Sequence, residues 1–509
     1  MFRCSLLATA FLASMAAGAA SAAPAANGAA VADLETMYWQ GRFEAAATCV
    51  ADDGATLERS ARLLWVDAVA RGGAPFRAWR LLAPELASAG GDSGAMRPDA
   101  DLLATAAAVH LALGRPHRSA EFVAALLDRH PEHPRGCVAA ACLALFQRDC
   151  AAAAAHVKNL QANELAKDTP LAGQLERETA RACGDSETLG AAWERAEIKA
   201  TARGDSVGAD RWRANRAMLA ALGAGPLYRL DAADDLVEVP LHDRTPGVPY
   251  KCFTLELAGE SFDVLLDTGN AVGWTIHEPR LLELLSCTRG RSTQILTGSV
   301  AEELPSHELA TPYLPLGPGA AVHDLVGYFF AKPHPDYHDA NLNPYLLRGR
   351  VVTLDFVRDR LILRSPERFA RDLAAVSPAH LARVPVGGHE WPFVPVTVNG
   401  VTDALAMIET GAEDLSLRLE FARQAGISLT PAVMTWRDES LDYHTAPITL
   451  QFGPLALHRA AAPVWPVRFH ANLSGLADHV MLGPAALEDR FVLSFDAEVR
   501  EAVIERVYP

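Results

Sequence analysis

Two stretches of this sequence end an apolar run in an acid, a threonine and a glycine. The first reads Phe-Asp-Val-Leu-Leu-Asp-Thr-Gly over residues 262–269, and the second reads Ala-Leu-Ala-Met-Ile-Glu-Thr-Gly over residues 404–411. An apolar run of this length predicts a buried β-strand, and a glycine after it lets the chain turn tightly and approach a ligand closely. Each strand would therefore deliver one carboxyl group, Asp267 or Glu409, to a sharp turn.

Two carboxyl groups a few ångströms apart can share one proton, because like charges at that distance cannot both ionise. The ionised group can act as a general base on water, while the protonated group polarises a carbonyl and later protonates a leaving group. Asp267 and Glu409 are the candidate pair. The sequence does not assign the shared proton to either of them.

The repeat extends beyond these two motifs. An alternating strand that ends in a glycine turn precedes each copy, at 252–259 and at 393–400, and Asn-Gly in the second turn is a hairpin signal. A strand, a charged turn and a second strand follow each copy, at 352–363 and 491–504. The acids are 142 positions apart and the preceding glycines, 259 and 400, are 141 apart. An internal duplication of an all-β unit explains this agreement.

With these motifs the sequence resembles the retropepsin-like aspartic proteases of the pepsin and retropepsin clan, with two lobes in one chain. Residues 409–414, Glu-Thr-Gly-Ala-Glu-Asp, are similar to the retroviral form of the active-site loop, and residues 480–483, Val-Met-Leu-Gly, resemble the apolar-apolar-glycine element beneath it. The resemblance covers residues 227–509. It implies an all-β bilobal domain and an aspartic endopeptidase in which Asp267 and Glu409 activate a water between the lobes to hydrolyse peptide bonds.

The resemblance also implies supporting roles. Thr268 and Thr410 would hydrogen-bond across the lobe interface and lock the two loops. Gly269 and Gly411 would leave room for the water and for close approach of the backbone. A hairpin flap would cover the cleft; the candidate in the first lobe is Thr297, Gly298 and Ser299, and that in the second is the stretch 436–443.

Three departures from the family pattern affect the expected activity. Glu409 replaces the usual second aspartate, and a displacement of about 1 Å at a catalytic group can reduce the rate about a hundredfold. Leu342-Asn343-Pro344 stands where the second lobe has Met-Leu-Gly, so the packing under the first loop should be altered or placed elsewhere. Asn270 follows the first glycine where a small residue is common.

The function therefore has competing interpretations. One is an active or weakly active peptidase, and another is a catalytically inactive scaffold that grips an extended peptide as an added strand. A third is that both motifs are ordinary structural turns. We expect no metal or other cofactor, because no histidine stands at ligand spacing near the motifs and two acids alone make a poor divalent site. No Gly-x-Ser-x-Gly follows a strong strand, as the elbow of a serine nucleophile requires.

The first part of the chain predicts an all-α domain at residues 31–223. It is rich in Ala and Leu, and helix breaks recur at Gly41, Gly73, Gly114, the 148–149 turn and Gly184, at intervals of 32 to 41 residues. The spacing resembles a degenerate tetratricopeptide repeat, whose helix pairs stack into a curved array. Such an array either offers a surface to a protein or peptide partner or only braces the β half.

The N-terminal residues 1–22 have the pattern of a secretory signal peptide, with Arg3, a short Ala-rich apolar run and Ala-Ser-Ala at 20–22. A membrane anchor is the alternative, but the run is short of the roughly 20 strongly apolar residues that a span needs. We therefore expect an exported protein, periplasmic or secreted, with no membrane span after cleavage.

Composition bounds the remaining expectations. The 509 residues carry 46 basic and 62 acidic side chains, a formal net charge of −16, which argues against nucleic-acid binding. An exported protein permits disulfides, and Cys142 and Cys150 are a candidate pair, with buried thiols as the favoured alternative.

After the signal peptide and the helical domain we expect a first lobe at 227–365, a connector at 366–383 and a second lobe at 384–509. Both acids lie in one chain, so a monomer should suffice.

Overall fold

The computed structural model describes residues 27–50, 54–89, 99–223, 225–243, 250–296, 303–332, 338–436, 439–466, 475–476, 479–488, 490–496 and 499–507. Within these residues the chain divides into two compact units. A helical unit comprises 27–183 with 475–476, and a β unit comprises 184–466 and 479–507.

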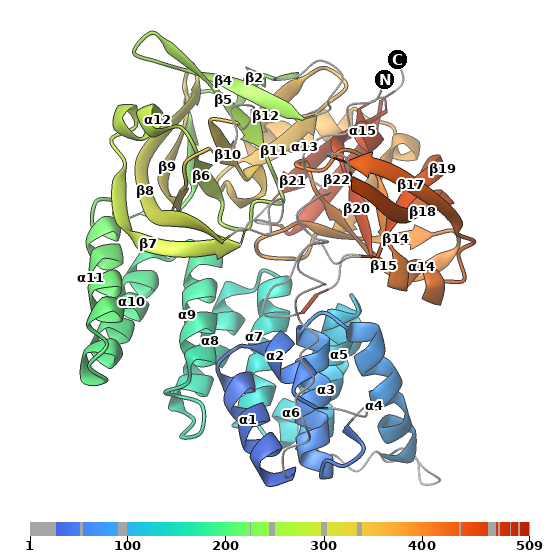
Figure 1. The fold of residues 1–509 in the computed structure, drawn as a ribbon. Coiled ribbons are helices and arrows are strands. Elements are labelled where there is room, and N and C mark those ends of the chain that lie inside the picture. The colour runs from blue at the N-terminus through green and yellow to red at the C-terminus, as the bar shows by residue number, and fades with distance from the viewer. Residues whose placement is uncertain are drawn as a thin grey trace. The chain divides into compact units, whose positions relative to one another are not determined.

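The helical unit is built from consecutive antiparallel helices. They are α1 Asn27–Trp39, α2 Phe43–Thr48, α3 Arg59–Arg71, α4 Pro75–Ala89, α5 Ala100–Ala112, α6 Pro116–Arg129, α7 Pro134–Phe146, α8 Cys150–Ala162 and α9 Pro170–Ala182 (Figure 1). The predicted breaks at Gly41, Gly73, Gly114 and 148–149 each fall between two helices. These three glycines and Arg148 have φ between 55° and 98°, the left-handed conformation that ends a helix. The paired-helix architecture expected from the sequence is confirmed.

Small side chains explain the close packing of this unit. Helix α5 is buried along nearly its whole length and contacts α3, α6 and α7. Alanine fills six of its thirteen positions, so the neighbouring helices can approach closely. The Asp99 side chain accepts hydrogen bonds from the backbone of the first turn and fixes where α5 begins.

One disulfide joins two helices of this unit. Cys150, the first residue of α8, is bonded to Cys183, which directly follows α9. The candidate pairing of Cys142 with Cys150 is therefore wrong. Cys142 lies inside α7 and is buried, and its sulfur accepts a hydrogen bond from Arg71.

The β unit begins with two helices, α10 Ser186–Ala202 and α11 Ser206–Leu219, and continues as two lobes (Figure 1). Elements of the first lobe are β1 Arg229–Ala232, β3 His242–Asp243, β4 Lys251–Leu257, β5 Glu260–Leu266, β6 Trp274–Ile276, α12 Pro279–Leu284, β7 Thr288–Leu296, β8 Glu303–Gly317, β9 Ala320–Phe329, β10 Ala340–Leu342 and the 3₁₀ turn Pro344–Leu346. Elements of the second are β14 Phe393–Val398, β15 Val401–Ile408, β16 Ser416–Arg418, α14 Leu419–Gln424, β17 Thr430–Trp436, β18 Glu439–Phe452, β19 Leu455–Trp465, β20 Val480–Leu482 and α15 Pro484–Leu487.

The two lobes repeat one strand order. The first lobe has β4-β5-β10-β6-β9-β8-β7, and the second has β14-β15-β20-β16-β19-β18-β17. Pairing directions also agree, since β5–β10 and β15–β20 are parallel while β10–β6 and β20–β16 are antiparallel. The duplication expected from the sequence is thus present in the fold.

A third sheet joins the lobes. Its order is β13-β22-β21-β11-β12-β2, formed by β2 Leu236–Pro240, β11 Val351–Asp355 and β12 Arg360–Arg364 from the first lobe and by β13 Leu381–Pro385, β21 Phe491–Asp496 and β22 Glu501–Arg506 from the second. At its centre Thr353 lies opposite Ser494, and their hydroxyl oxygens are 2.8 Å apart. The connector is helical, with α13 Pro366–Ala374 and a 3₁₀ turn at Pro378–His380. Backbone hydrogen bonds therefore hold the lobes together directly.

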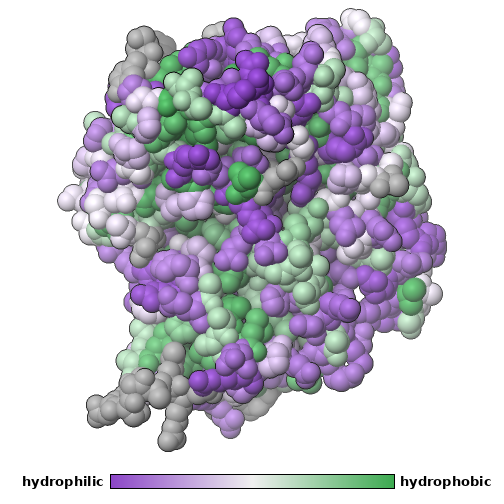
Figure 2. Space-filling model, turned by 180° about the vertical axis from the view of Figure 1, so that it is seen from behind, coloured by the Kyte–Doolittle hydropathy of each residue, from purple (hydrophilic) through white to green (hydrophobic). Residues whose placement is uncertain are grey.

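The expected fold class, an α-helical domain followed by a bilobal β domain, is confirmed. Figure 2 shows one face of the molecule, on which hydrophilic residues are interspersed with smaller hydrophobic groups. Among the helices that the structure describes, none is both long and apolar enough to cross a membrane.

Candidate active site

The two acid-threonine-glycine loops meet through their threonines. The Thr268 backbone N–H donates to the Thr410 hydroxyl and the Thr410 N–H donates to the Thr268 hydroxyl, both at 2.9 Å. Each hydroxyl in turn donates to the backbone of the opposite strand, Thr268 to Ile408 O and Thr410 to Leu266 O, both at 2.7 Å. Both threonines are almost fully buried. These reciprocal bonds fix the two loops against each other.

Each loop presents its carboxyl group in the same way. The Gly269 N–H donates to Asp267 Oδ1 at 3.0 Å, and the Gly411 N–H donates to Glu409 Oε1 at 2.9 Å. Asp267 is half-buried, whereas only 5% of Glu409 is exposed. A backbone N–H pointing at a carboxylate oxygen fixes the side chain and favours its charged form.

The glycines show how close the two carboxyl groups lie. A Cβ added to Gly411 would lie 2.7 Å from Asp267 Oδ1 and 2.9 Å from Glu409 Oε1, so these oxygens are no farther apart than the sum of the two distances. A Cβ on Gly269 would overlap the Glu409 carboxyl group. The structure thus brings Asp267 and Glu409 together, and any side chain larger than glycine at either position would occupy the space beside them.

Equivalent strands, β10 and β20, lie beneath the two loops. The Asp267 N–H donates to Leu342 O at 2.9 Å, and the Glu409 N–H donates to Leu482 O at 3.0 Å, at the ends of the parallel pairs β5–β10 and β15–β20. Of the two outcomes expected for the first lobe, the element is therefore not placed elsewhere; its packing is altered. What differs is Asn343, the counterpart of Gly483.

Asn343 replaces a tight backbone contact with side-chain hydrogen bonds. Its amide donates to Asn270 O at 3.0 Å and Glu390 O at 2.9 Å, and it reaches Thr268 O at 3.3 Å. At Gly483 an added Cβ would lie 2.7–2.9 Å from the backbone of 412–414, so only glycine fits there. The two lobes therefore support equivalent loops by different means.

Three polar side chains around the first loop were not predicted. The Asn341 amide donates to Asp267 Oδ2 at 3.2 Å, and the Trp391 indole donates to Gly269 O at 2.8 Å. The Asn270 amide lies 3.4 Å from both Thr275 Oγ1 and Asn341 O, so the unusual residue after the first glycine braces the loop. The signals in the sequence were the polar Asn-Leu-Asn-Pro segment at 341–344 and Asn270, which departs from the family pattern; nothing in the sequence indicated Trp391.

The predicted flap residues Thr297, Gly298 and Ser299 lie outside the described residues. The hairpin that carries them is present, since β7 and β8 pair antiparallel as far as Leu296 opposite Glu303. Its counterpart β17–β18 carries the other candidate, whose residues 437–438 are likewise outside the described part. Helix α11 contacts β7, where Asn215 accepts the Arg291 backbone N–H at 3.2 Å.

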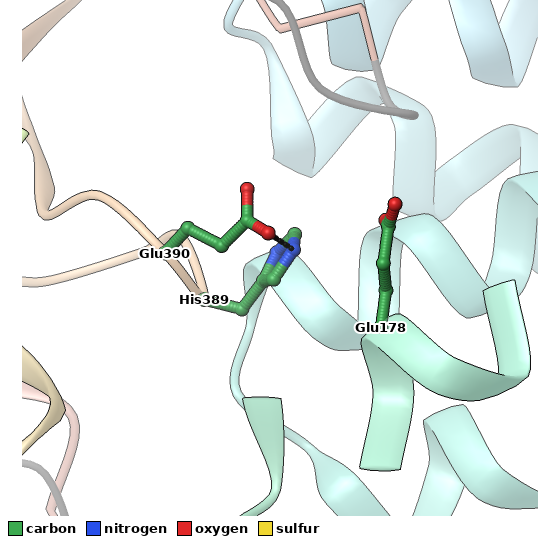
Figure 3. Close-up of side chains that lie close together, drawn as sticks. All are labelled: Glu178, His389 and Glu390. Carbon is green, nitrogen blue, oxygen red and sulfur yellow. Dashed lines mark ion pairs between the residues drawn. The ribbon is translucent and has the colours of Figure 1, made fainter. Parts of the chain in front are cut away.

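The loop ahead of β14 places a histidine beside a glutamate. His389 Nε2 lies 3.7 Å from Glu390 Oε1 (Figure 3). Glu178, drawn in the same view, belongs to the helical unit. Two ligands do not complete a zinc site, because structural and catalytic zinc sites take at least three from the protein.

Two lobes of matching strand order are joined by a shared sheet, and each lobe ends a strand in an acid that lies close to the other. Among solved structures, the chain is similar to an aspartic proteinase from Irpex lacteus, with a TM-score of 0.34 and 8% sequence identity over 53% of this chain and 97% of that chain. No family model and no curated protein matches the sequence.

Proposed function

We propose that the protein is an aspartic endopeptidase in which Asp267 and Glu409 activate water to hydrolyse peptide bonds. The observation that carries this proposal is the pairing of the two loops, whose reciprocal threonine bonds hold both carboxyl groups beside Gly411. Burying the carboxyl group of a glutamate carries a large desolvation penalty, and a turn with only a structural role would not require it.

The chemistry follows from one shared proton. The ionised carboxylate removes a proton from water as that water attacks the peptide carbonyl carbon, and the protonated carboxyl group hydrogen-bonds the carbonyl oxygen. Collapse of the tetrahedral intermediate transfers a proton to the departing amine. The additional methylene of Glu409 is compatible with this scheme, because its Oε1 is held by the Gly411 N–H as Asp267 Oδ1 is by Gly269.

The alternative is a scaffold that grips an extended peptide without cleaving it. The burial of Glu409, 5% exposed, favours it, because a carboxyl group withdrawn from solvent has less access to a substrate. Binding would then add the peptide as a strand, with backbone hydrogen bonds supplying affinity.

Cleavage of a denatured protein mixture between about pH 3 and 7 tests the proposal, with Asp267→Asn and Glu409→Gln as variants. Loss of cleavage in both variants supports the acid pair, and cleavage unaffected by either rejects it. If the wild type binds peptides without cutting them, the scaffold is the correct alternative. Thr254→Val, at an exposed position of β4, serves as the control for handling and folding.

Further proposals concern the rest of the chain. We propose export to the periplasm or the medium, a monomeric catalytic unit, and a protein or peptide partner on the helical unit. N-terminal sequencing of the exported protein tests export, and sedimentation at micromolar concentration tests the monomer. The partner is tested by comparing the substrate affinity of the full chain with that of a chain that lacks residues 31–183.

A further inference from the structure

Asn341 lies at a position where the two lobes differ. It is the middle residue of β10 and pairs with Leu265, one residue before the pair Leu342–Leu266. In the second lobe the same register places Met481 opposite Met407. An asparagine amide can donate two hydrogen bonds and a methionine side chain none, so only the first lobe offers a donor here.

The donor reaches the first acid. Asn341 Nδ2 lies 3.2 Å from Asp267 Oδ2, the oxygen that the Gly269 N–H does not contact. Both carboxylate oxygens of Asp267 thus accept an N–H. Hydrogen bonds to the charged form of a carboxyl group favour ionisation.

We propose that Asn341 is a positioning residue that holds Asp267 as the ionised general base, so that Glu409 carries the shared proton and acts as the general acid. This inference rests on the proposed peptidase function and assigns the roles within its acid pair. Burial of Glu409 acts in the same direction, because removal from water disfavours the charged form of a carboxyl group.

A neutral histidine lies behind Asn341. Burial lowers the pKa of His277 to about 3, so its ring is uncharged above about pH 4. Its Nδ1 lies 3.4 Å from Phe330 O, its Nε2 lies 3.5 Å from Thr275 Oγ1, and the ring also hydrogen-bonds the Asn341 side chain. The His277 ring therefore contributes hydrogen bonds behind Asn341 and no positive charge.

Two basic groups, His338 and Lys332, act on the His277 ring and lower its pKa further. Lys332 is paired with Asp339 at 2.5 Å and with Glu278 at 3.3 Å. Glu409, across the loop pair, is the acidic group that faces Asp267, and Asn341 is the amide that distinguishes the two.

The test compares Asn341→Leu and Asn341→Asp with the wild type in the pH dependence of kcat and KM. Asn341→Leu removes the donor, so Asp267 should take up its proton at higher pH. A hydrogen bond to a charged group corresponds to about one pH unit or more, so the acid limb of the kcat profile should move up by about one unit. At a pH below both midpoints kcat should therefore fall about tenfold, with KM within twofold. Asn341→Asp, which adds a third carboxyl group, should lose more activity than Asn341→Leu.

Gln451→Leu is the matched control, because it makes the same amide-to-leucine change at an exposed position on β18. Its profile should overlay the wild type. An unmoved acid limb in folded Asn341→Leu overturns the assignment, as does equal loss of kcat at every pH, which would indicate a merely structural role.

A second measurement separates this inference from the proposed function. In protein labelled with ¹³C-aspartate, the infrared carboxylate band absent from Asp267→Asn reports the ionisation of Asp267 without any substrate. Its midpoint should rise by about one pH unit in Asn341→Leu. If the midpoint rises but the wild type cleaves no peptide, the proposed peptidase function is rejected and Asp267 is still the ionised acid of the pair. If the wild type cleaves peptides but the midpoint does not rise, only the assignment of the ionised acid to Asp267 is rejected.

Discussion

The substitution Thr410→Val tests the contact between the two loops. Valine has nearly the same shape as threonine, so it removes the hydroxyl without leaving a cavity. Two hydrogen bonds disappear, the one accepted from the Thr268 N–H and the one donated to Leu266 O. Both groups belong to buried residues, Thr268 and Leu266 each being 0% exposed, so water cannot replace the lost partner.

The magnitude follows from these two groups. A buried donor or acceptor left without a partner costs about 1–3 kcal/mol, so Thr410→Val should destabilise the β unit by about 2–6 kcal/mol. Since a whole domain is stable by only about 5–15 kcal/mol, this is a large effect. Scanning calorimetry of the full chain measures it, with the transition of the helical unit as internal reference.

The control is Thr254→Val on β4, whose exposed hydroxyl lies 3.0 Å from His242 Nε2. Such a surface change should stay within about 0.5 kcal/mol. Thr268→Val removes the other two bonds of the set, so the double variant should be less stable than either single one, by an amount that differs from the sum because the two threonines are in direct contact. A change of less than about 0.5 kcal/mol in Thr410→Val, or a double variant no less stable than either single one, would refute the view that these bonds hold the loops together.

Three further predictions concern other parts of the chain. Gly411→Ala should abolish cleavage with little change in far-UV circular dichroism, because the new Cβ would lie 2.7 Å from Asp267 Oδ1 and 2.9 Å from Glu409 Oε1; retained kcat would show that this space is not used. Cys150→Ser should lower the stability of the helical unit by about 3–4 kcal/mol, since the disulfide with Cys183 closes a loop of 33 residues, and reductant should then have no further effect on its melting temperature. Lys251, 2.7–3.0 Å from Asp243, Asp359 and Glu488, has a raised pKa, because burial alone would lower it but the hydrogen bonds to these carboxylates outweigh burial. Its stabilising contribution is therefore present below the ordinary lysine pKa of 10.5 and lost as the pH rises beyond it. Lys251→Met should thus lower the free energy of unfolding at pH 7 and flatten the decline of that free energy above pH 10. An unchanged decline above pH 10 would contradict this reasoning.

Periodic features of the chain were readable from the sequence. The alternating and apolar strands around both motifs, their spacing of 141–142 residues and the glycine breaks of the helical unit are local patterns, and β5, β15 and the helix turns lie where these patterns place them. The strand beneath each loop was recognised only in the second lobe, because Gly483 preserves the pattern and Asn343 does not.

Contacts between distant residues were not readable in the same way. Cys150 finds Cys183 because the end of α9 returns to the start of α8, a distance that spacing alone does not reveal. Asn341 and Trp391 reach the first loop from 74 and 122 positions away along the chain. The role of Asp267 and Glu409 as a catalytic pair stays a prediction that the variants above test, and the role of residues 297–299 as a flap stays a prediction.

The matching strand order of the lobes has a consequence for how such a site can change over time. In an assembly of two identical chains, every substitution appears on both sides of the axis. Here each lobe has its own sequence within one polypeptide, so one member of an equivalent pair can be substituted without the other. Asp267 and Glu409, and Asn341 and Met481, are such pairs. The shared central sheet keeps the halves in register when this happens. Division of labour between two once-equivalent acids is therefore open to this chain and closed to a symmetric dimer.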